Sequence, residues 1–312
     1  MPTPIAVFAF NRPDHLRRTL DALAANDLAA ESDVTIFCDG PRSEAETEKT
    51  TAVRNVAKAA QGFASLTIVE RDKNLGCAAA VIDGLTQMFA QQEKLIVIED
   101  DILTSPYTLR YLNTALDKYA DNPVIFNIAA WSPPPSLMPV PPTYPYDAYC
   151  IPRFNCWGWA SWRDRWQKVE LAISDYELFK AQPTLQTAFN KGGRDLTPML
   201  RAQMEGDLET WDILVDYARF KQGCVGLNPI RAYTTNIGMG SGTHTVEFTT
   251  RFDNDITQAV PNPNLPEHIF VDDDIAHAYR EACAPSPPTL PVRVVNKIRR
   301  ILSKNRLFTS HP

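Results

Sequence analysis

Short apolar runs alternate with helical patterns through the first 130 residues, and this alternation constrains the fold more than any other feature. Strands are predicted at 5–10, 34–38, 66–69, 95–98 and 124–128, and helices at 14–30, 43–61, 76–91 and 106–119. Parallel neighbouring strands need a crossover, which is usually a helix. We therefore predict an α/β fold with a mostly parallel sheet flanked by helices, and expect Asp14 to cap the first helix.

The apolar run 95–98 leads directly into three consecutive acids, Glu99, Asp100 and Asp101. Such a run is typical of a strand buried on both faces. In open α/β sheets, ligands bind at the carboxyl ends of the strands. Three adjacent carboxylates repel one another unless a cation joins them, and hard oxygen ligands suit Mg²⁺ or Mn²⁺. A metal site is therefore predicted here, with a solvated acidic turn as the alternative.

The other strand ends add charged residues to the same edge. Arg12 follows the first predicted strand, and Asp39 follows the second. An arginine, an isolated aspartate and a carboxylate cluster suit a nucleotide whose diphosphate is bridged by a metal. The glycine signatures of dinucleotide-binding oxidoreductases and of P-loop proteins are absent from the sequence.

The second half of the chain begins in a segment with seven prolines, at 133–145. Four of the six tryptophans fall within 157–166, where they could form a core or a sugar-binding wall. Asp212 and Asp216 are four residues apart and would share a helix face. The glycine-rich segment 234–244 ends in His244 and suits a mobile lid. We predict subdomains at 1–131 and 132–292, followed by a tail at 293–312.

Composition limits the classes of protein. A net charge of −6 argues against general nucleic-acid binding. No secretory signal or membrane-spanning stretch is visible, and six cysteines without a CxxC pair suggest reduced thiols in a cytoplasmic protein. Residues 293–306 hold six basic residues and no acidic ones, with apolar residues on one helical face. This tail is predicted to be a basic amphipathic helix that binds an anionic membrane surface or packs on the protein.

Short motifs spread over residues 4–245 resemble the GT-A-fold nucleotide-sugar glycosyltransferases. The nearest pattern is that of the N-acetylglucosaminyltransferases of N-glycan branching, together with related bacterial sugar transferases. The matching motifs occur in the family's order, and they are residues 7–13, 38–40, 97–101, 157–159, 211–212 and the His244 loop. The chain departs from the family at Ile213, where a second carboxylate would be expected, and in having no basic residues near the lid.

The resemblance implies a role for each matching residue. Arg12 and Asp39 would contact the nucleotide, Asp100 would face the ribose, and Glu99 would order metal-bound water. Asp101 would bind Mn²⁺ (or Mg²⁺) directly. The loop containing Gly240 and Gly242 would close over the donor diphosphate.

The chemistry of sugar transfer from a nucleotide-sugar requires a base as well as a metal. The acceptor hydroxyl must lose a proton as it attacks the anomeric carbon, so a carboxylate base is needed. The resemblance points to Asp212, with Glu209 and Asp207 as fallback candidates. His244 would be a third metal ligand or a plain polar contact.

The expected function is an inverting, metal-dependent glycosyltransferase that uses a nucleotide-sugar donor, in the first place a UDP-sugar. Its acceptor would be a hydroxyl of a surface glycan or glycolipid precursor, at the inner face of the cytoplasmic membrane. A sugar-nucleotide pyrophosphorylase is an alternative, although 11–14 lacks the glycine-rich, basic loop that a triphosphate needs. A catalytically inactive nucleotide-sugar-binding scaffold is the other alternative.

Overall fold

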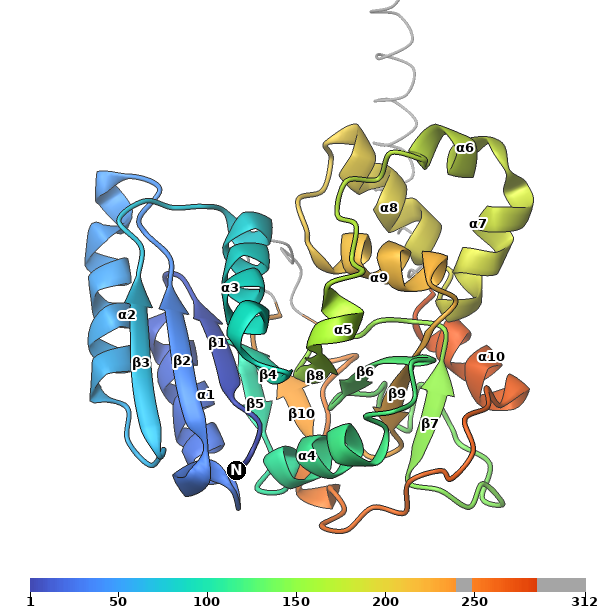
Figure 1. The fold of residues 1–312 in the computed structure, drawn as a ribbon, viewed down its shortest axis with the longest axis horizontal. Helices are drawn as coiled ribbons and strands as arrows, with labels where there is room; N and C mark the ends of the chain where they lie inside the picture. The colour runs from blue at the N-terminus through green and yellow to red at the C-terminus, as the bar shows by residue number, and fades with distance from the viewer. Residues whose placement is uncertain (240–248, 285–312) are drawn as a thin grey trace, which may run out of the picture.

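The computed structural model describes residues 1–239 and 249–284. Within these ranges, eight strands form one mixed sheet in the order β3-β2-β1-β4-β8-β6-β9-β7 (Figure 1). Their bounds are β1 Ile5–Ala9, β2 Asp33–Cys38, β3 Ser65–Glu70, β4 Lys94–Glu99, β6 Ile125–Ala129, β7 Ala148–Ile151, β8 Trp159–Trp162 and β9 Val225–Pro229. Two short strands, β5 (Ile102–Thr104) and β10 (Thr234–Asn236), pair antiparallel beside this sheet.

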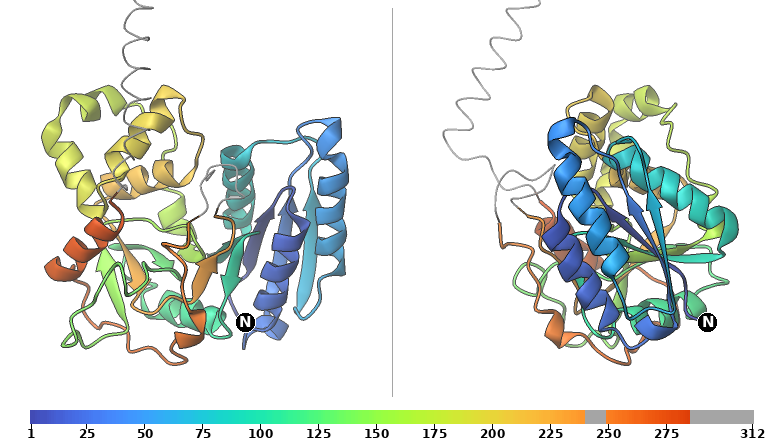
Figure 2. Two further views of the ribbon diagram at one scale, coloured as in Figure 1. Left: turned by 180° about the vertical axis from the view of Figure 1, so that it is seen from behind. Right: turned by 90° about the vertical axis from the view of Figure 1, so that its left-hand side faces the viewer.

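Helices cover both faces of the sheet (Figures 1 and 2). The α-helices are α1 Pro13–Ala24, α2 Thr47–Ala59, α3 Cys77–Gln91, α4 Thr108–Lys118, α5 Arg163–Trp166, α6 Tyr176–Ala181, α7 Pro183–Phe189, α8 Leu196–Glu205, α9 Asp212–Lys221 and α10 Asp273–Ala282. Short 3₁₀ turns lie at Ala29–Glu31, Glu44–Glu46, Asn190–Gly192 and Ile256–Gln258.

The two-residue period of the central strands creates two separate cores. Ile5 and Val7 of β1 pack with α1, α2 and α4 on one face. Ala6 and Phe8 pack with α3, α5 and α9 on the other. Both cores need apolar side chains from the same strand, which explains the continuous apolar runs in the sequence.

The first four strands confirm the predicted parallel arrangement, since β1 pairs parallel with both β2 and β4, and β2 with β3. Beyond β4 the sheet becomes mixed, because β8 inserts antiparallel between β4 and β6. Strands from both halves of the chain thus share one sheet. The subdomain division at 131 and 132 stays a prediction.

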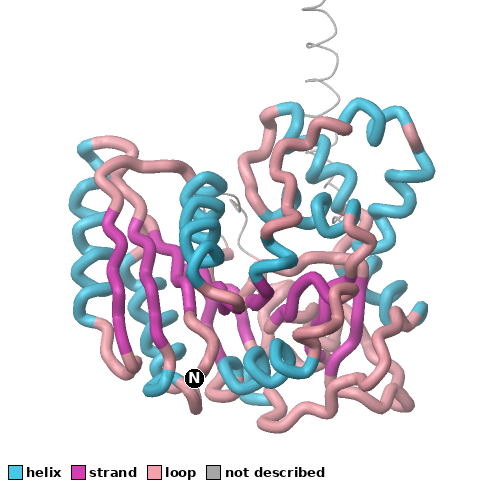
Figure 3. Tube along the Cα trace, viewed as in Figure 1, coloured by secondary structure: helices cyan, strands magenta, loops and turns pink. Residues whose placement is uncertain are grey.

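One local expectation was wrong. Asp14 does not cap α1: the helix begins at Pro13, Arg12 holds the cap position, and no side chain caps this end. Proline favours the first helical position, and Arg12 is drawn instead towards acids at the end of β4. The polar region 170–208 forms the separate helices α6, α7 and α8, which with α9 enclose a small core of their own (Figure 3).

Candidate active site

The three predicted acids lie where β4 ends, directly beside the end of β1. Phe8 of β1 pairs with Glu99, the last residue of β4. Arg12, just beyond β1, forms ion pairs with both Asp100 and Asp101, the second at an Nη1–Oδ2 distance of 3.1 Å. The structure therefore brings together four of the residues that the sequence singled out.

These acids concentrate more negative charge than Arg12 neutralises. Burial, followed by the charges of Asp101, Asp100 and Asp212, raises the pKa of Glu99 well above its usual value. Burial also raises the pKa of Asp100 to about 6, although Arg12 opposes the shift. The folded protein thus binds these protons more tightly than the unfolded chain does. The stability that these two groups contribute is consequently lost as pH rises from about 4 through the raised values.

The acids differ in exposure, which separates their possible roles. The Asp100 side chain is 5% exposed, whereas that of Asp101 is 14% exposed. Among the described residues, no three His, Cys, Asp or Glu side chains form a protein-only metal cage. Mg²⁺-type ions in nucleotide sites use one or two carboxylates together with substrate phosphates. The excess negative charge and the more exposed Asp101 fit a cation held jointly by the protein and a diphosphate.

Gly238 covers this carboxylate from the chain beyond β10. A Cβ atom at this position would lie 2.0 Å from Asp101 Oδ2 and 2.8 Å from Arg12 Nη1. The Ile237 amide also donates a hydrogen bond to the Asp101 carbonyl at 2.8 Å. A side chain larger than that of glycine would therefore force the Asp101 carboxylate or the backbone at Gly238 to shift.

We expect Gly238→Ala to weaken Mn²⁺ binding in the presence of UDP by about tenfold, because Asp101 or the loop must shift, as in an overpacked interior. Calorimetric titration with Mn²⁺ would measure this, with Ile237→Val as a neighbouring control. Unchanged Mn²⁺ affinity in Gly238→Ala would show that the close approach is irrelevant to the metal.

Asp39 lies at the end of β2, where it fixes one wall of a cavity. Its carboxylate is buried and accepts hydrogen bonds from the amides of Gly40 (2.9 Å) and Leu75 (3.1 Å) and from Asn74 Nδ2 (2.9 Å). These bonds tie the loop before α3 to the end of β2. Asn74 and Leu75 were not anticipated, since no sequence pattern links them to a residue 35 and 36 positions away.

The cavity extends across the carboxyl ends of β1, β2 and β4 to the start of α3. Arg12, Asp39, Glu99 and Asp100 all line it. The rings of Phe8 and Phe37, stacked at 5.1 Å, add an apolar surface. A polar end, lined by Arg12 and carboxylates, and an apolar end therefore occur in one hollow.

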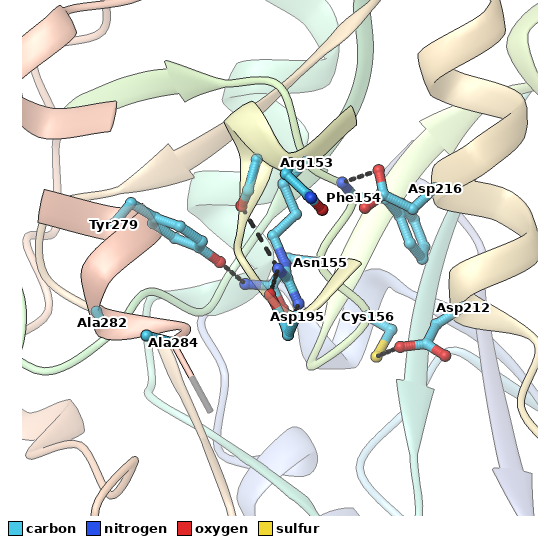
Figure 4. Close-up of polar contacts among 12 residues, drawn as sticks. Arg153, Phe154, Asn155, Cys156, Asp195, Asp212, Asp216, Tyr279, Ala282 and Ala284 are labelled. Atoms are coloured by element: carbon cyan, nitrogen blue, oxygen red, sulfur yellow. Dashed lines mark hydrogen bonds and ion pairs between the residues drawn. The ribbon is translucent and has the colours of Figure 1, made fainter. Parts of the chain in front are cut away.

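Asp212 comes from the second half of the chain, where it is the first residue of α9. Thr210 Oγ1 donates a hydrogen bond to its Oδ1. The Cys156 thiol lies 3.9 Å from its Oδ2 (Figure 4). Burial, then the charge of Asp212, raises the pKa of Cys156 well above its usual value, so the thiol remains a neutral donor. Asp212 is thus oriented by two donors. Cys156, 56 residues earlier in the chain, gave no signal in the sequence.

The remaining candidates have different positions. Asp216 is buried and engaged by the Phe154 amide (2.9 Å) and Arg219 Nε (2.6 Å). Glu209 lines the cavity, while Asp207 is exposed. The predicted residues Gly240, Gly242 and His244 and the tail lie outside the described residues.

Residues 2–131 match the model of a family described as glycosyltransferase like family 2. No curated protein matches the chain. Three solved structures illustrate the partial likenesses found. A mannosyltransferase from Pyrobaculum calidifontis in complex with GDP-Man and Mn²⁺ is 20% identical, covering 52% of this chain and 45% of its own, with a TM-score of 0.38. TarS from S. aureus is 12% identical over 75% of this chain and 60% of its own, with a TM-score of 0.44.

The galactosyltransferase LgtC, solved with donor and acceptor sugar analogues, is 12% identical, covering 71% of this chain and 72% of its own, with a TM-score of 0.38. The chain therefore spans less than two thirds of the mannosyltransferase and TarS chains. Residues 2–131 thus match a glycosyltransferase family model, and the mixed α/β sheet on which they lie is consistent with the GT-A fold.

Proposed function

We propose that the protein is an inverting, metal-dependent glycosyltransferase that moves a sugar from a nucleotide-sugar, in the first place a UDP-sugar, to a hydroxyl of a surface glycan or glycolipid precursor. One observation carries the proposal. The candidate donor residues at the ends of β1, β2 and β4 line one cavity, and Asp212 approaches from α9 closely enough for its charge to raise the pKa of Glu99.

The donor half follows from the residues that line the cavity and from Asp101, which forms an ion pair with Arg12 of that lining. Asp101 would hold Mn²⁺ or Mg²⁺, which supplies positive charge to the departing diphosphate. Arg12 fixes the positions of Asp100 and Asp101 and adds a second positive charge at this edge. Asp100 would face the ribose, Asp39 holds the wall against which the nucleotide would lie, and Glu99 would order water next to the cation.

The acceptor half depends on Asp212. Its free lone pairs would accept the proton of the acceptor hydroxyl while the oxygen attacks the anomeric carbon. The bond from that carbon to the diphosphate oxygen breaks, and its electron pair leaves with the diphosphate. A single in-line displacement of this kind inverts the anomeric configuration.

A panel of nucleotide-sugars incubated with Mn²⁺ would test the proposal. We expect slow, metal-dependent release of nucleoside diphosphate from at least one donor, and no release in EDTA. Formation of a nucleoside triphosphate from sugar-nucleotide and pyrophosphate would instead identify a pyrophosphorylase. Binding of donors without hydrolysis or transfer would identify an inactive scaffold.

The tail, residues 293–312, is proposed to bind the membrane surface. None of the helices in residues 1–239 and 249–284 combines the length and apolar character that a membrane crossing demands. The basic residues of 293–306 would attract anionic lipid at the inner face of the cytoplasmic membrane, at roughly 1 kcal/mol each near the surface.

Deletion of 293–312 is expected to weaken binding to phosphatidylserine-containing vesicles by about tenfold or more, as measured by vesicle sedimentation. The intact chain should also bind more weakly as salt increases. Neutral phosphatidylcholine vesicles provide the control. Equal binding of the intact and shortened chains to anionic vesicles would reject the membrane role.

A further inference from the structure

Four apolar and aromatic side chains, here called the aromatic patch, gather where the chain enters α10: Tyr144, Tyr146, Phe270 and Val271. The three rings lie together, with centroid distances of 5.8 Å between the two tyrosines and of 6.3 and 6.4 Å from these to Phe270. Phe270 and Val271 are 43% and 38% exposed, and in the part of the chain that the structure describes they are the only adjacent pair of large exposed apolar side chains. Apolar surface gathered in one place marks an interaction site, whereas single exposed residues do not.

Folding accounts for only one side of this patch. Tyr144 packs against the small core that the edge strand β7 shares with α10 (Figure 1), and its hydroxyl donates a hydrogen bond to the Ala148 carbonyl at 3.0 Å. Tyr146, Phe270 and Val271 belong to none of the cores that the described residues form. Covering the exposed part of the patch with a partner surface would therefore be favourable.

Three acids border the patch, since Asp272 directly follows Val271 in the chain. Asp272 caps α10 by accepting hydrogen bonds from the amides of Asp274 (3.1 Å) and Ile275 (3.0 Å). Asp273 and Asp274 are exposed in the first turn. Negative charge at a helix N-terminus stabilises the helix, but that effect does not need exposed aromatic neighbours. A partner that matches this surface would combine an apolar side with positive charge.

The tail of the same chain has this composition. Residues 293–306 contain six basic residues and no acidic ones. Its apolar residues recur at helical spacing, so that a helix would present them on one side: Val294, Val295, Ile298, Ile301 and Leu302. The apolar side matches the aromatic patch, and the basic residues match the charges of Asp272 to Asp274.

The chain between α10 and the tail is long enough to return to the patch. α10 has ten residues, Asp273–Ala282, so its two ends are about 15 Å apart. Residues 285–292 include four prolines and would span about 25 Å when extended, at roughly 3.1 Å per residue. A short linker gives an effective concentration on the order of millimolar, which favours docking within one chain over docking on a second copy.

We propose that the aromatic patch and Asp272 to Asp274 form a docking site for residues 293–306 of the same chain, which an anionic membrane surface displaces. The docking site does not depend on glycosyl transfer, whereas the displacement rests on the membrane role proposed above. The apolar residues of the tail cannot contact the patch and the lipid at the same time, so the two surfaces compete for them. The tail thus stays covered on the protein until anionic lipid is present.

Photo-crosslinking in the full chain tests the docking site. Leu302 is replaced by p-benzoylphenylalanine, and cross-linked peptides are identified by mass spectrometry in an equal mixture of unlabelled and heavy-isotope-labelled chains. We expect cross-links within one chain to the peptides that contain Tyr144 or Phe270, and fewer of them as salt increases. Cross-links only to other surfaces would overturn the site. Cross-links between labelled and unlabelled chains would show docking on a second copy instead.

Binding to phosphatidylserine-containing vesicles measures the competition. Phe270→Ala should bind these vesicles about tenfold more tightly than the wild type, because the docked state loses an aromatic contact while the lipid-bound state loses nothing. Asp273→Asn combined with Asp274→Asn should shift vesicle affinity in the same direction. A gain of affinity distinguishes displacement of the tail from damage to a membrane-binding surface, which would lower the affinity.

Matched controls come from surfaces away from α10. Leu178→Ala truncates a side chain of α6 that is 56% exposed, and Glu44→Gln combined with Glu48→Gln neutralises two exposed acids near the start of α2. Both should bind vesicles like the wild type. Unchanged vesicle affinity in both patch variants would overturn the competition. A wild type that forms the expected cross-links but binds no anionic vesicles would reject the membrane role and leave the docking site in place.

Discussion

Asp101→Asn is expected to reduce Mn²⁺-dependent donor hydrolysis by at least about 100-fold, because the neutral amide is a poor ligand for a hard cation and the diphosphate loses its counter-charge. The fold should survive. Arg12 keeps its ion pair with Asp100, so no buried charge is left unpaired. Nucleotide release as a function of Mn²⁺ concentration measures the effect.

The same substitution should raise thermal stability slightly at neutral pH. The charge of Asp101 contributes to the raised pKa values of Glu99 and Asp100, and its removal relieves part of the repulsion that opposes their ionisation. Lost activity with a retained or higher Tm would therefore mark a binding residue rather than a structural one.

Asp14→Asn provides a matched control for Asp101→Asn, since Asp14 lies in the first turn of α1, is 84% exposed and pairs with Arg17. It should leave hydrolysis unchanged. If Asp101→Asn hydrolyses the donor like the wild type across the Mn²⁺ range, the metal does not depend on Asp101.

Asp212→Asn should lower transfer by about 10²- to 10⁴-fold, the range expected for loss of a general base, while UDP and Mn²⁺ still bind. The amide has the size of the carboxylate, and its oxygen can still accept a hydrogen bond from Thr210. Initial rates of transfer should therefore fall, with little change in nucleotide affinity measured by calorimetry.

Asp207→Asn is the control for the base, because Asp207 is exposed and lies five residues earlier in the chain. It should transfer normally. Unimpaired turnover in Asp212→Asn would move the base elsewhere, and Glu209 would be the first alternative because it lines the cavity.

The N-terminal half of the fold was predictable because its strands are buried on both faces. Each of the first four predicted strands overlaps an observed strand, with ends that differ by one residue. The insertion of β8 between β4 and β6 was not predictable, because an antiparallel strand of four residues, Trp159–Trp162, has little periodicity of its own. Its place depends on long-range pairing with β4, some 60 residues away.

The sequence by itself determined which chemical groups follow the strands: Arg12 after β1, Asp39 after β2 and Glu99 to Asp101 at the end of β4. Parallel strands bring their carboxyl ends to one edge, so the order of elements was enough to predict that these groups would meet. The match of residues 2–131 to a glycosyltransferase family model agrees with the resemblance that the motifs carry.

Only the tertiary structure decided which of the acids keep carboxylate oxygens free to bind a ligand. Asp212 and Asp216 look equivalent in the sequence, four residues apart on one helix. Packing surrounds Asp216 with Arg219 and the Phe154 amide, whereas Asp212 is only half-buried and meets the Thr210 hydroxyl and the Cys156 thiol. Burial and hydrogen bonding depend on neighbours that are distant in the chain, and local sequence pattern contains no record of them.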